Sequence, residues 1–384
     1  MTRAVFLAHT AAPSGAELAT MRLIAALRAC SDVDASIVVT EPGPMVATMR
    51  ARGIPVTVYD NDFDSRSMTL SGAGSGPLPV LRGAARLARL GLRLGAEIRA
   101  AEADVLVAVS VKALLIGAVA ARRARVPLVW QVHDRVSAEY FGRFLATAIR
   151  LLCLLCCAGA IANSRATAAS LGLRRVPTVV AYPGVEFGAD RPRAGQRPAA
   201  EAVVALVGRL TPWKGQDVAL RALAATAVPP RRVLVVGGTF FGEEPYRARL
   251  EALAAELALP ATFTGHVDDP APHLDDADVL VHCSVVTEPF GQVVVEGMAA
   301  GCAVIAADAG GPAEIVRDGV DGLLVTPAVA PLTAALDRLL ADPRLRGALG
   351  AAARDRARAF DVTESARVVA GFLTAIAGRE RVPR

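Results

Sequence analysis

The chain has 384 residues, enough for two or three domains of ordinary size. Hydrophobic residues make up 53% of it, which excludes intrinsic disorder for most of its length. Its net charge of +5 suits an anionic ligand or membrane surface but is too weak to indicate nucleic acid, and an aromatic content of 4% argues against base-stacking modules.

Neither the N-terminus nor the longest apolar stretch has the pattern of a targeting or membrane-spanning segment. The first apolar run, Ala4–Ala8, is too short for a signal peptide, and an acid follows at Glu17. In Phe144–Ala162 the charge of Arg150 leaves only about 12 apolar residues in a row, fewer than the roughly 18–20 that span a bilayer. We therefore expect this stretch to form a buried helix that runs into a buried strand.

The six cysteines give no sign of a disulfide framework or a metal site. Cys153, Cys156 and Cys157 have helical spacing within the apolar stretch, with no His or acid nearby to complete a set of metal ligands. The other three are scattered singly, which makes the cytoplasm the default compartment. We expect inert core thiols and a cytoplasmic protein, with the inner face of the cytoplasmic membrane as a second location that the basic charge allows.

Short apolar runs alternate with helical stretches along the whole chain. In the first half, the expected strands are Ala4–Ala8, Ser36–Thr40, Val56–Tyr59, Val105–Val109, Leu128–Val132, Ala160–Ala162 and Thr178–Ala181. In the second half, they are Val203–Val207, Val233–Val236, Thr262–Thr264, Val279–His282, Ala303–Ala306 and Leu323–Val325. Most are continuously apolar, which is typical of parallel sheets covered by helices on both faces. The pattern predicts two doubly wound α/β domains.

A change of composition separates the two halves. The segment Glu186–Glu201 carries Pro, Gly and Arg without apolar periodicity, so it is interpreted as a linker. We expect an N-terminal domain over residues 1–185, the linker over 186–201 and a C-terminal domain over 202–384. The last expected helix, Val362–Ala377, is the one element that could return to the N-terminal domain.

A Gly/Ser/Pro-rich loop over Asn61–Pro79 precedes an arginine-rich helix. Loops of this length are usually functional. The helix places four arginines on one face at steps of four, three and four residues, namely Arg82, Arg86, Arg89 and Arg93. Two interpretations stay open here, a solvated face or a surface for anionic lipid.

Ligands bind beyond the carboxyl ends of the strands in parallel α/β domains, so we expect the binding residues in the loops there. After the first strand, Gly15 lies at a helix start, where backbone approach and the helix N-terminus favour an anion. After the first strand of the second half, Arg209 and Lys214 share one short loop. A planar guanidinium and a mobile ammonium make a suitable pair for a diphosphate, although two solvated cations are an equally good interpretation of this loop alone.

The most informative segment is Glu288–Gly301. Pro289 and Gly291 set a turn, and the helix that follows carries Glu296, eight residues after Glu288. One acid therefore lies at the loop and the other lies more than a turn into the helix. They can reach opposite ends of an extended ligand such as a sugar and a ribose.

Taken together, these motifs make the chain resemble the family 4 glycosyltransferases of the GT-B class. The resemblance rests on the two-domain layout, on GRLTPWKG at 208–215 and on EPFGQVVVE at 288–296, which matches the family's Glu-x7-Glu signature. It is looser in the first half, where SGAE at 14–17 replaces the usual GGAE-type turn. The implied fold is GT-B, with two Rossmann-like doubly wound parallel-sheet domains facing across a cleft.

The resemblance also implies roles for individual residues. Arg209 and Lys214 would hold the donor diphosphate, and His133 would contact the sugar. Glu288 would hold sugar hydroxyls and phosphate together with the backbone amides of Phe290, Gly291, Gln292 and Val293. Glu296 would hold the ribose. The remaining donor-binding positions are backbone ones, with Gly208 and Gly15 beside the phosphates and Gly265, His266 and Val267 beside the base.

The implied reaction is transfer of a hexose-type sugar from a nucleotide-diphosphate sugar to a hydroxyl acceptor, with retention at the anomeric carbon. The acceptor would be a polysaccharide, a lipid-linked glycan or a small molecule. Neither a cofactor nor a metal ion is expected, and the metal-binding pattern Asp-x-Asp at Asp60–Asp62 and Asp276–Asp278 is interpreted as chance surface sequence. A GT-B-type sugar-nucleotide epimerase and a non-catalytic sugar-nucleotide-binding relative remain as alternatives.

Overall fold

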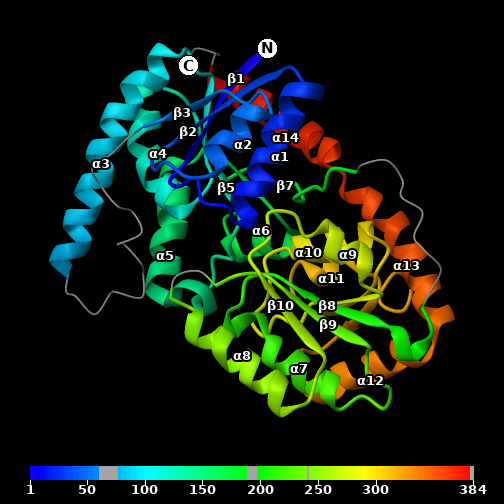
Figure 1. Ribbon diagram of the computed structural model, residues 1–384. Helices are drawn as coiled ribbons and strands as arrows, with labels where there is room; N and C mark the ends of the chain where they lie inside the picture. Colours follow the sequence, from blue (N-terminus) through cyan, green and yellow to red (C-terminus); the bar gives the residue numbers. More distant parts are fainter. Residues whose placement is uncertain (60–76, 188–196, 240–241, 381–384) are drawn as a thin grey trace. The chain divides into compact units, whose positions relative to one another are not determined.

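The computed structural model describes residues 1–59, 77–187, 197–239 and 242–380, and each part of the chain is considered within them. By its internal contacts the chain divides into two compact units (Figure 1). Unit 1 consists of Met1–Gly184 together with Val362–Arg384, and unit 2 consists of Val185–Asp361. The C-terminal helix therefore belongs to the unit that contains the N-terminus.

Unit 1 is built on a seven-stranded parallel sheet with the order β3-β2-β1-β4-β5-β6-β7. The strands are β1 (Thr2–Ala8), β2 (Val33–Val39), β3 (Val56–Val58), β4 (Val105–Ala108), β5 (Leu128–Val132), β6 (Gly159–Ala162) and β7 (Thr178–Val180). The helices are α1 (Gly15–Cys30), α2 (Met45–Ala51), α3 (Pro77–Ala100), α4 (Val111–Ala124), α5 (Ala138–Cys156), α6 (Arg165–Leu171) and α14 (Val362–Glu380).

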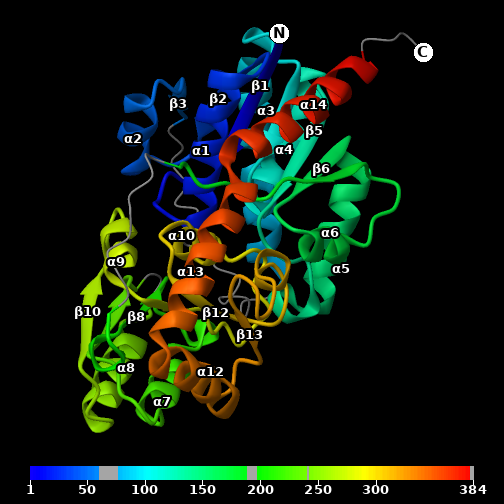
Figure 2. The same cartoon turned by 90° about the vertical axis from the view of Figure 1, so that its right-hand side faces the viewer.

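The sheet of unit 1 separates two hydrophobic cores. Residues of α1, α2 and α14 pack on one face, where Val369 and Leu373 of α14 are buried. Residues of α3, α4 and α5 pack on the other face, where Leu94 and Trp130 are buried (Figures 1 and 2). The central strands are buried on both sides, which explains why their sequences are apolar without alternation.

Unit 2 contains a six-stranded parallel sheet with the order β10-β9-β8-β11-β12-β13. The strands are β8 (Val203–Val207), β9 (Arg232–Val236), β10 (Ala261–Gly265), β11 (Val279–Val281), β12 (Ala303–Ala307) and β13 (Leu323–Val325). The α-helices are α7 (Gln216–Ala224), α8 (Glu244–Glu256), α9 (Ala271–Asp276), α10 (Gln292–Ala299), α11 (Pro312–Ile315), α12 (Val329–Ala341) and α13 (Pro343–Ala357). Short 3₁₀ turns lie at η3 (Ala199–Glu201), η4 (Pro212–Lys214) and η5 (Arg358–Phe360).

The predicted α/β fold of two Rossmann-like parallel-sheet domains is confirmed, and every strand expected from the sequence is present. In both sheets the strand order reverses beside the first strand of the unit, between β1 and β4 and between β8 and β11. Such a reversal opens a crevice outside the carboxyl ends of the strands, where α/β domains bind ligands.

The expectation of a buried helix after Phe144 is wrong. Helix α5 buries Ala146, Ile149 and Cys153, but its opposite face is open to solvent, with the side chain of Phe144 88% exposed. Cys156 is likewise exposed and not a core thiol. Among the residues that the structure describes, no helix is long and apolar enough to cross a membrane.

Candidate functional site

The strand-end loops of unit 2 are held side by side by backbone hydrogen bonds. The amide of Gly208 donates to Val236 O (2.9 Å), and the amide of Gly237 donates to Gly265 O (3.0 Å). Gly208 has a φ of 142° and Gly237 a φ of 145°, and a Cβ built on Gly237 would lie 2.0 Å from Gly208 O. Only glycine allows this approach, and it leaves bare backbone at the ends of β8, β9 and β10.

Lys214 is carried to the end of β11 by the 3₁₀ turn η4. The turn ends at Gly215, whose φ is 67°, and a Cβ at that position would lie 2.3 Å from Cys283 O. The amide of Val285 donates to Trp213 O over 2.9 Å, which fixes the same two loops to each other. The tight packing of η4 on the 283–285 segment therefore determines where the lysine points.

At this junction Lys214 meets Glu288. The ammonium Nζ donates to Glu288 Oε2 over 2.6 Å, and the same oxygen accepts from Ser284 Oγ at 2.8 Å. His282 Nε2 lies 3.4 Å from that oxygen and 3.1 Å from Ser284 Oγ. The side chains of Lys214 and Glu288 are only 17% and 11% exposed, so the ion pair is largely removed from water.

The electrostatics of this cluster keep the glutamate charged. Burial by itself raises the pKa of Glu288, but the Lys214 ammonium and the hydrogen bond from His282 outweigh burial and hold that pKa well below its usual range. Glu288 is therefore a carboxylate at neutral pH, able to accept hydrogen bonds and unable to donate a proton. Burial raises the pKa of the neighbouring Cys283 thiol to about 12, so this thiol stays protonated.

Arg209 approaches the same group of loops from the end of β8. Its guanidinium lies 5.9 Å from the ring centre of Trp213, and its Nε lies 3.6 Å from Glu243 Oε2. The Lys214 ammonium lies 4.4 Å from the same ring, so Trp213 contacts both cations. Gln216 Nε2 donates to Arg209 O over 2.8 Å and fixes the backbone at that residue.

Two glycines on the loop after β12 support the backbone of Glu288. The amide of Gly311 donates to Glu288 O over 3.0 Å. A Cβ on Gly310 would lie 2.2 Å from Glu288 O, and one on Gly311 would lie 2.2 Å from Phe290 Cα. Phe290 itself is buried and packs against Phe360, with ring centres 6.1 Å apart. Phe290 thus anchors the turn, and its side chain does not face solvent.

Helix α10 begins directly after this turn. Gly291, with a φ of 92°, precedes its first residue, Gln292. Gln292 Nε2 donates to Glu296 Oε1 over 2.9 Å, and both side chains are partly exposed. Gln292 therefore lies at the helix start and holds the carboxylate of Glu296, which lies one turn further along α10.

The two remaining predicted residues lie in unit 1. Gly15 is the first residue of α1, and a Cβ there would meet no atom within 4 Å. His133 follows β5, where Thr20 Oγ1 lies 3.3 Å from its Nε2 and Asn163 Nδ2 donates to its backbone carbonyl. Burial lowers the pKa of His133 to about 4, so its imidazole is neutral at physiological pH.

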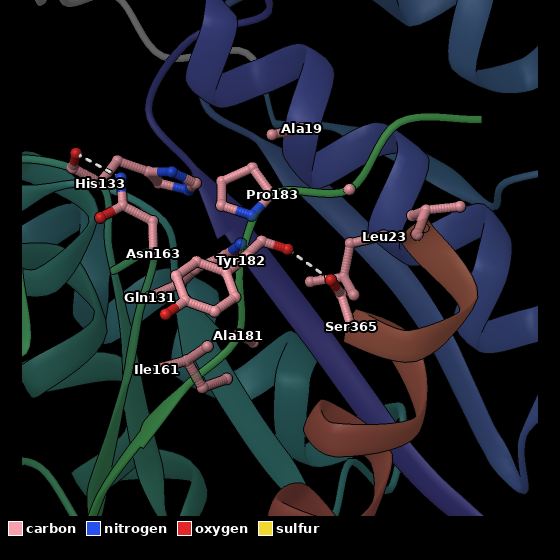
Figure 3. Close-up of a pocket in the computed structure, with 12 residues that line it drawn as sticks. Ala19, Leu23, Gln131, His133, Ile161, Asn163, Ala181, Tyr182, Pro183 and Ser365 are labelled. Atoms are coloured by element: carbon pink, nitrogen blue, oxygen red, sulfur yellow. Dashed lines mark hydrogen bonds between the residues drawn. The ribbon is translucent and has the colours of Figure 1, made fainter. Parts of the chain in front are cut away.

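His133 borders a small pocket at the carboxyl ends of β5, β6 and β7 (Figure 3). The pocket has a volume of about 20 Å³, room for little more than one water molecule. Gln131, Asn163 and Ser365 supply its polar groups, and Asn163 Oδ1 has no hydrogen-bond partner within the described part of the chain. The pocket suits a bound water and is too small for a sugar.

The structure thus brings Lys214 and Glu288 into direct contact, with Trp213 linking Lys214 to Arg209. It places Gly208, Gly265, His266 and Val267 at the neighbouring strand ends, Gly291, Gln292 and Val293 at the start of α10, and Glu296 one turn into that helix. The partners of Glu288 that sequence reasoning missed are His282, Ser284 and the Gly310–Gly311 pair. The first two follow β11 directly, so the strand-end rule that selected the other loops also applies to them.

The two Asp-x-Asp strings have different outcomes. Asp60–Asp62 lies outside the described residues. Asp276 and Asp278 are not chance surface acids, because Asp278 is buried and both are paired with Arg197, over 2.7 Å and 3.0 Å. Among the residues that the structure describes, no group of three or more His, Cys, Asp and Glu residues could hold a metal ion.

Family models match most of both units. The model described as glycosyl transferases group 1 matches residues 190–356, and the model described as glycosyltransferase family 4 matches residues 45–187. The D-inositol 3-phosphate glycosyltransferase of Mycobacterium tuberculosis is 39% identical over 194 residues, which cover 46% of this chain and 40% of that protein. The chain thus aligns with less than half the length of the curated relatives that it matches.

Solved structures resemble the chain over nearly its full length. Anabaena HepE in complex with UDP and glucose is 28% identical, has a TM-score of 0.81 and covers 98% of this chain and 100% of its own. The sucrose-phosphate synthase of Thermosynechococcus elongatus is 22% identical with a TM-score of 0.77, covers 99% of this chain and 100% of its own, and supports the fold alone. The chain therefore shares its fold of two parallel-sheet α/β units with these structures.

Proposed function

We propose that this chain, which the family models support as a group 1 glycosyltransferase, transfers a hexose from a nucleotide-diphosphate sugar to a hydroxyl acceptor with retention at the anomeric carbon. The observation that carries the proposal is the buried Lys214–Glu288 pair at the strand ends of unit 2, with Arg209 across the Trp213 ring. A cation pair suits a diphosphate, and an ionised carboxylate suits sugar hydroxyls.

The diphosphate of the donor binds Arg209 and Lys214. Its oxygens compete with Glu288 for the Lys214 ammonium, which is on a flexible stem and can reorient with little cost. The guanidinium of Arg209 supplies a planar pair of donors, held by Trp213 and by the fixed backbone of its own residue. The bare backbone at Gly208 lets the phosphates approach, because a side chain at that position would occupy the space.

Once Lys214 turns to the diphosphate, Glu288 accepts hydrogen bonds from the sugar. Its depressed pKa excludes a role as proton donor at neutral pH and favours one as hydrogen-bond acceptor. Ser284 and His282 continue to bind Glu288 Oε2, the oxygen that Lys214 leaves, and keep the carboxylate in place. The amides of residues 290–293 at the start of α10 face the negative charge of the phosphate.

Other parts of the donor are assigned to the remaining strand-end residues. Glu296 accepts from the ribose hydroxyls, and the backbone of Gly265, His266 and Val267 borders the base. In unit 1, the open space at Gly15 admits phosphate oxygens. His133 has a neutral imidazole that can donate or accept one hydrogen bond to the sugar without adding charge.

The chemical step requires no protein nucleophile. The bond between the anomeric carbon and the diphosphate oxygen breaks while the acceptor oxygen forms its bond on the same face of the sugar. The acceptor's proton passes to the departing phosphate oxygen, so atoms and charge balance. Arg209 and Lys214 stabilise the negative charge that develops on the leaving group, and the loss of one such donor typically costs a factor of roughly 10²–10³ in turnover.

The proposed reaction uses no cofactor and no metal ion, and its acceptor is a polysaccharide, a lipid-linked glycan or a small molecule. The proposed location of the protein is the cytoplasm, with contact to anionic membrane through the arginines of α3. UDP-hexoses are the first donors to test, because the HepE structure was solved with UDP and glucose.

Ligand-detected NMR with UDP-, GDP-, ADP- and TDP-sugars on the purified chain tests the proposal. We expect selective binding of one donor without added metal, weakened roughly tenfold in Glu296→Ala. Binding should be retained in Glu256→Ala, which removes an exposed acid at the end of α8. Slow release of the free α-sugar would support transfer without an acceptor. A sugar changed in configuration would favour an epimerase, and binding of no donor would refute the proposal.

A further inference from the structure

Most of the large hydrophobic side chains that are exposed in the described residues lie on one helical layer of unit 1. Ten large hydrophobic side chains are exposed among the described residues, and six of them lie on α3, α4 and α5. They are Leu92, Leu115, Phe144, Leu151, Leu154 and Leu155. The greatest exposure is that of Phe144, at 88%, and that of Leu155, at 72%. Clustered exposed side chains of this size mark an interaction surface more often than scattered ones do.

On α5 these residues form a continuous stripe. Phe144, Ala148, Leu151 and Leu155 follow one another at steps of four, three and four residues, so they share one face of the helix over roughly 16 Å. The helix cannot rotate to hide this face. Its inner side chains Ile149 and Cys153 are buried, and the guanidinium of Arg150 donates to Ser170 O over 2.8 and 3.1 Å.

The same layer is strongly basic. Helices α3, α4 and α5 contain ten Lys and Arg residues but only two acids, Glu97 and Glu139, whereas the whole chain has 42 basic and 37 acidic residues. Helix α4 packs against both α3 and α5, so the three surfaces adjoin (Figure 1). Arg122 of α4 lies close enough to Cys156 at the end of the α5 stripe to affect its thiol pKa.

We infer that the outer face of α3, α4 and α5 binds an anionic membrane surface, with the α5 stripe lying in the lipid interface. An interfacial helix combines an apolar face with basic flanks, as found here. Within the described residues, no ion pair engages Arg89, Arg93 or Arg143, and all three are exposed. They can therefore bind lipid phosphates while Phe144 and Leu155 enter the acyl boundary.

The occupant is a lipid surface and not a soluble protein because charge and apolarity occur together. A second copy of this chain would bring like charges together on this face, which costs energy that an apolar stripe of one helix must overcome. An anionic bilayer supplies the opposite charge and an apolar phase at once. The inference extends the membrane contact proposed above for α3 but does not depend on the transfer reaction, because all the residues that it uses belong to unit 1 whereas Lys214 and Glu288 belong to unit 2.

Flotation of the purified full-length chain with vesicles tests the inference. Phosphatidylcholine vesicles with and without phosphatidylglycerol are compared at low and at high salt. We expect binding only to the anionic vesicles, weakened by salt. Leu151→Ser/Leu155→Ser should lower the partition coefficient more than tenfold, because two leucine side chains no longer transfer from water into the lipid. Arg89→Gln/Arg93→Gln should lower it roughly fivefold for each charge at low salt.

Matched variants elsewhere on the chain show whether the loss of binding is specific to this surface or follows from any loss of charge or apolar side chains. Arg174→Gln/Arg175→Gln removes two exposed arginines elsewhere in unit 1, and Val320→Ser/Val329→Ser removes two exposed apolar side chains of unit 2. Both should bind vesicles like the parent chain, and all variants should keep their thermal midpoint and nucleotide-sugar binding. Failure of the parent chain to float with anionic vesicles, or parent-like binding by the leucine variant, would overturn the inference. A leucine variant that converts a dimer to a monomer without affecting flotation would assign the face to a second copy.

Discussion

Replacement of Lys214 by Met should destabilise unit 2 in a pH-dependent way. The ammonium lies 2.6 Å from Glu288 Oε2, and the two side chains are 17% and 11% exposed. At an effective dielectric constant near 20, such a pair is worth roughly 4–6 kcal/mol before desolvation is counted. Removal of one partner of a largely buried pair leaves the other charge stranded, and we expect a loss of about 3 kcal/mol in the free energy of unfolding at pH 7.

The sign of the pH effect follows from Glu288. In the parent chain its pKa is held below the usual 4.5, so its contribution to stability is present above pH 4.5 and is lost as the pH falls below that value. In the Lys214→Met variant the lysine that opposes burial is gone, and we expect burial to outweigh the remaining contacts of Glu288 and raise its pKa above 4.5. The variant then loses stability as the pH rises from 4.5 toward the new pKa, so the deficit relative to the parent should be larger at pH 8 than at pH 5.

Urea unfolding at both pH values measures this deficit, followed by fluorescence in a Trp130→Phe background that leaves Trp213 of unit 2 as the single tryptophan. Arg221→Met is the control, because it removes an exposed positive charge from the adjacent helix α7 and should cost less than about 0.5 kcal/mol. Glu288→Gln and the double variant complete a thermodynamic cycle, with an expected coupling energy of about 2–3 kcal/mol. A Lys214→Met deficit below about 1 kcal/mol, equal at both pH values, would refute the buried-pair reasoning.

Three further predictions follow from single contacts. Gly311→Ala should cost about 1–3 kcal/mol in unfolding free energy and weaken donor binding, because its Cβ would lie 2.2 Å from Phe290 Cα. The control is Gly371→Ala on α14, whose Cβ would meet no atom within 4 Å and which should stabilise the chain slightly in the same thermal unfolding experiments. Glu296→Ala should lower donor affinity roughly tenfold by calorimetry at an unchanged thermal midpoint, and equal affinity for nucleoside and deoxynucleoside diphosphates in the parent chain would contradict the ribose assignment. Burial lowers the pKa of His133 to about 4 in the folded chain, so this residue should cost stability as the pH falls from 6.5 to about 4, and NMR titration of its ring should place the transition near 4 and not near 6.5.

The strands were predictable because burial on both faces imposes one simple rule. A strand inside a covered parallel sheet needs apolar residues at every position, and β5 and β8 begin and end where the apolar runs Leu128–Val132 and Val203–Val207 do. The same rule locates the ligand-binding edge, since residues just beyond each run must lie at the carboxyl end of the sheet. His282 and Ser284 were accessible to this reasoning but gave no motif that singles them out.

The features that were not predicted depend on which distant segments approach one another, and the local sequence pattern does not encode such contacts. The Gly310–Gly311 pair matters because the loop after β12 passes against the backbone of Glu288 and Phe290, a contact between segments about 20 residues apart. The α5 stripe was misjudged for a related reason. A helix that is apolar all round predicts complete burial, but only one side of α5 meets the sheet, and no other described element covers Phe144.

The lysine at position 214 is unusual in this chain, because nearly all of the other basic residues are arginines. Of its 42 basic residues only Lys112 and Lys214 are lysines, so arginine is used almost everywhere that a positive charge is needed. An arginine at 214 could bind Glu288 through a two-pronged pair, which would stabilise the pair and oppose its separation. A lysine holds the same oxygen with a single ammonium that can rotate to a second anion. The pair observed between Lys214 and Glu288 is therefore suited to exchange: it neutralises a buried carboxylate in the free protein, and a bound diphosphate can take over the ammonium while Ser284 and His282 still bind that carboxylate.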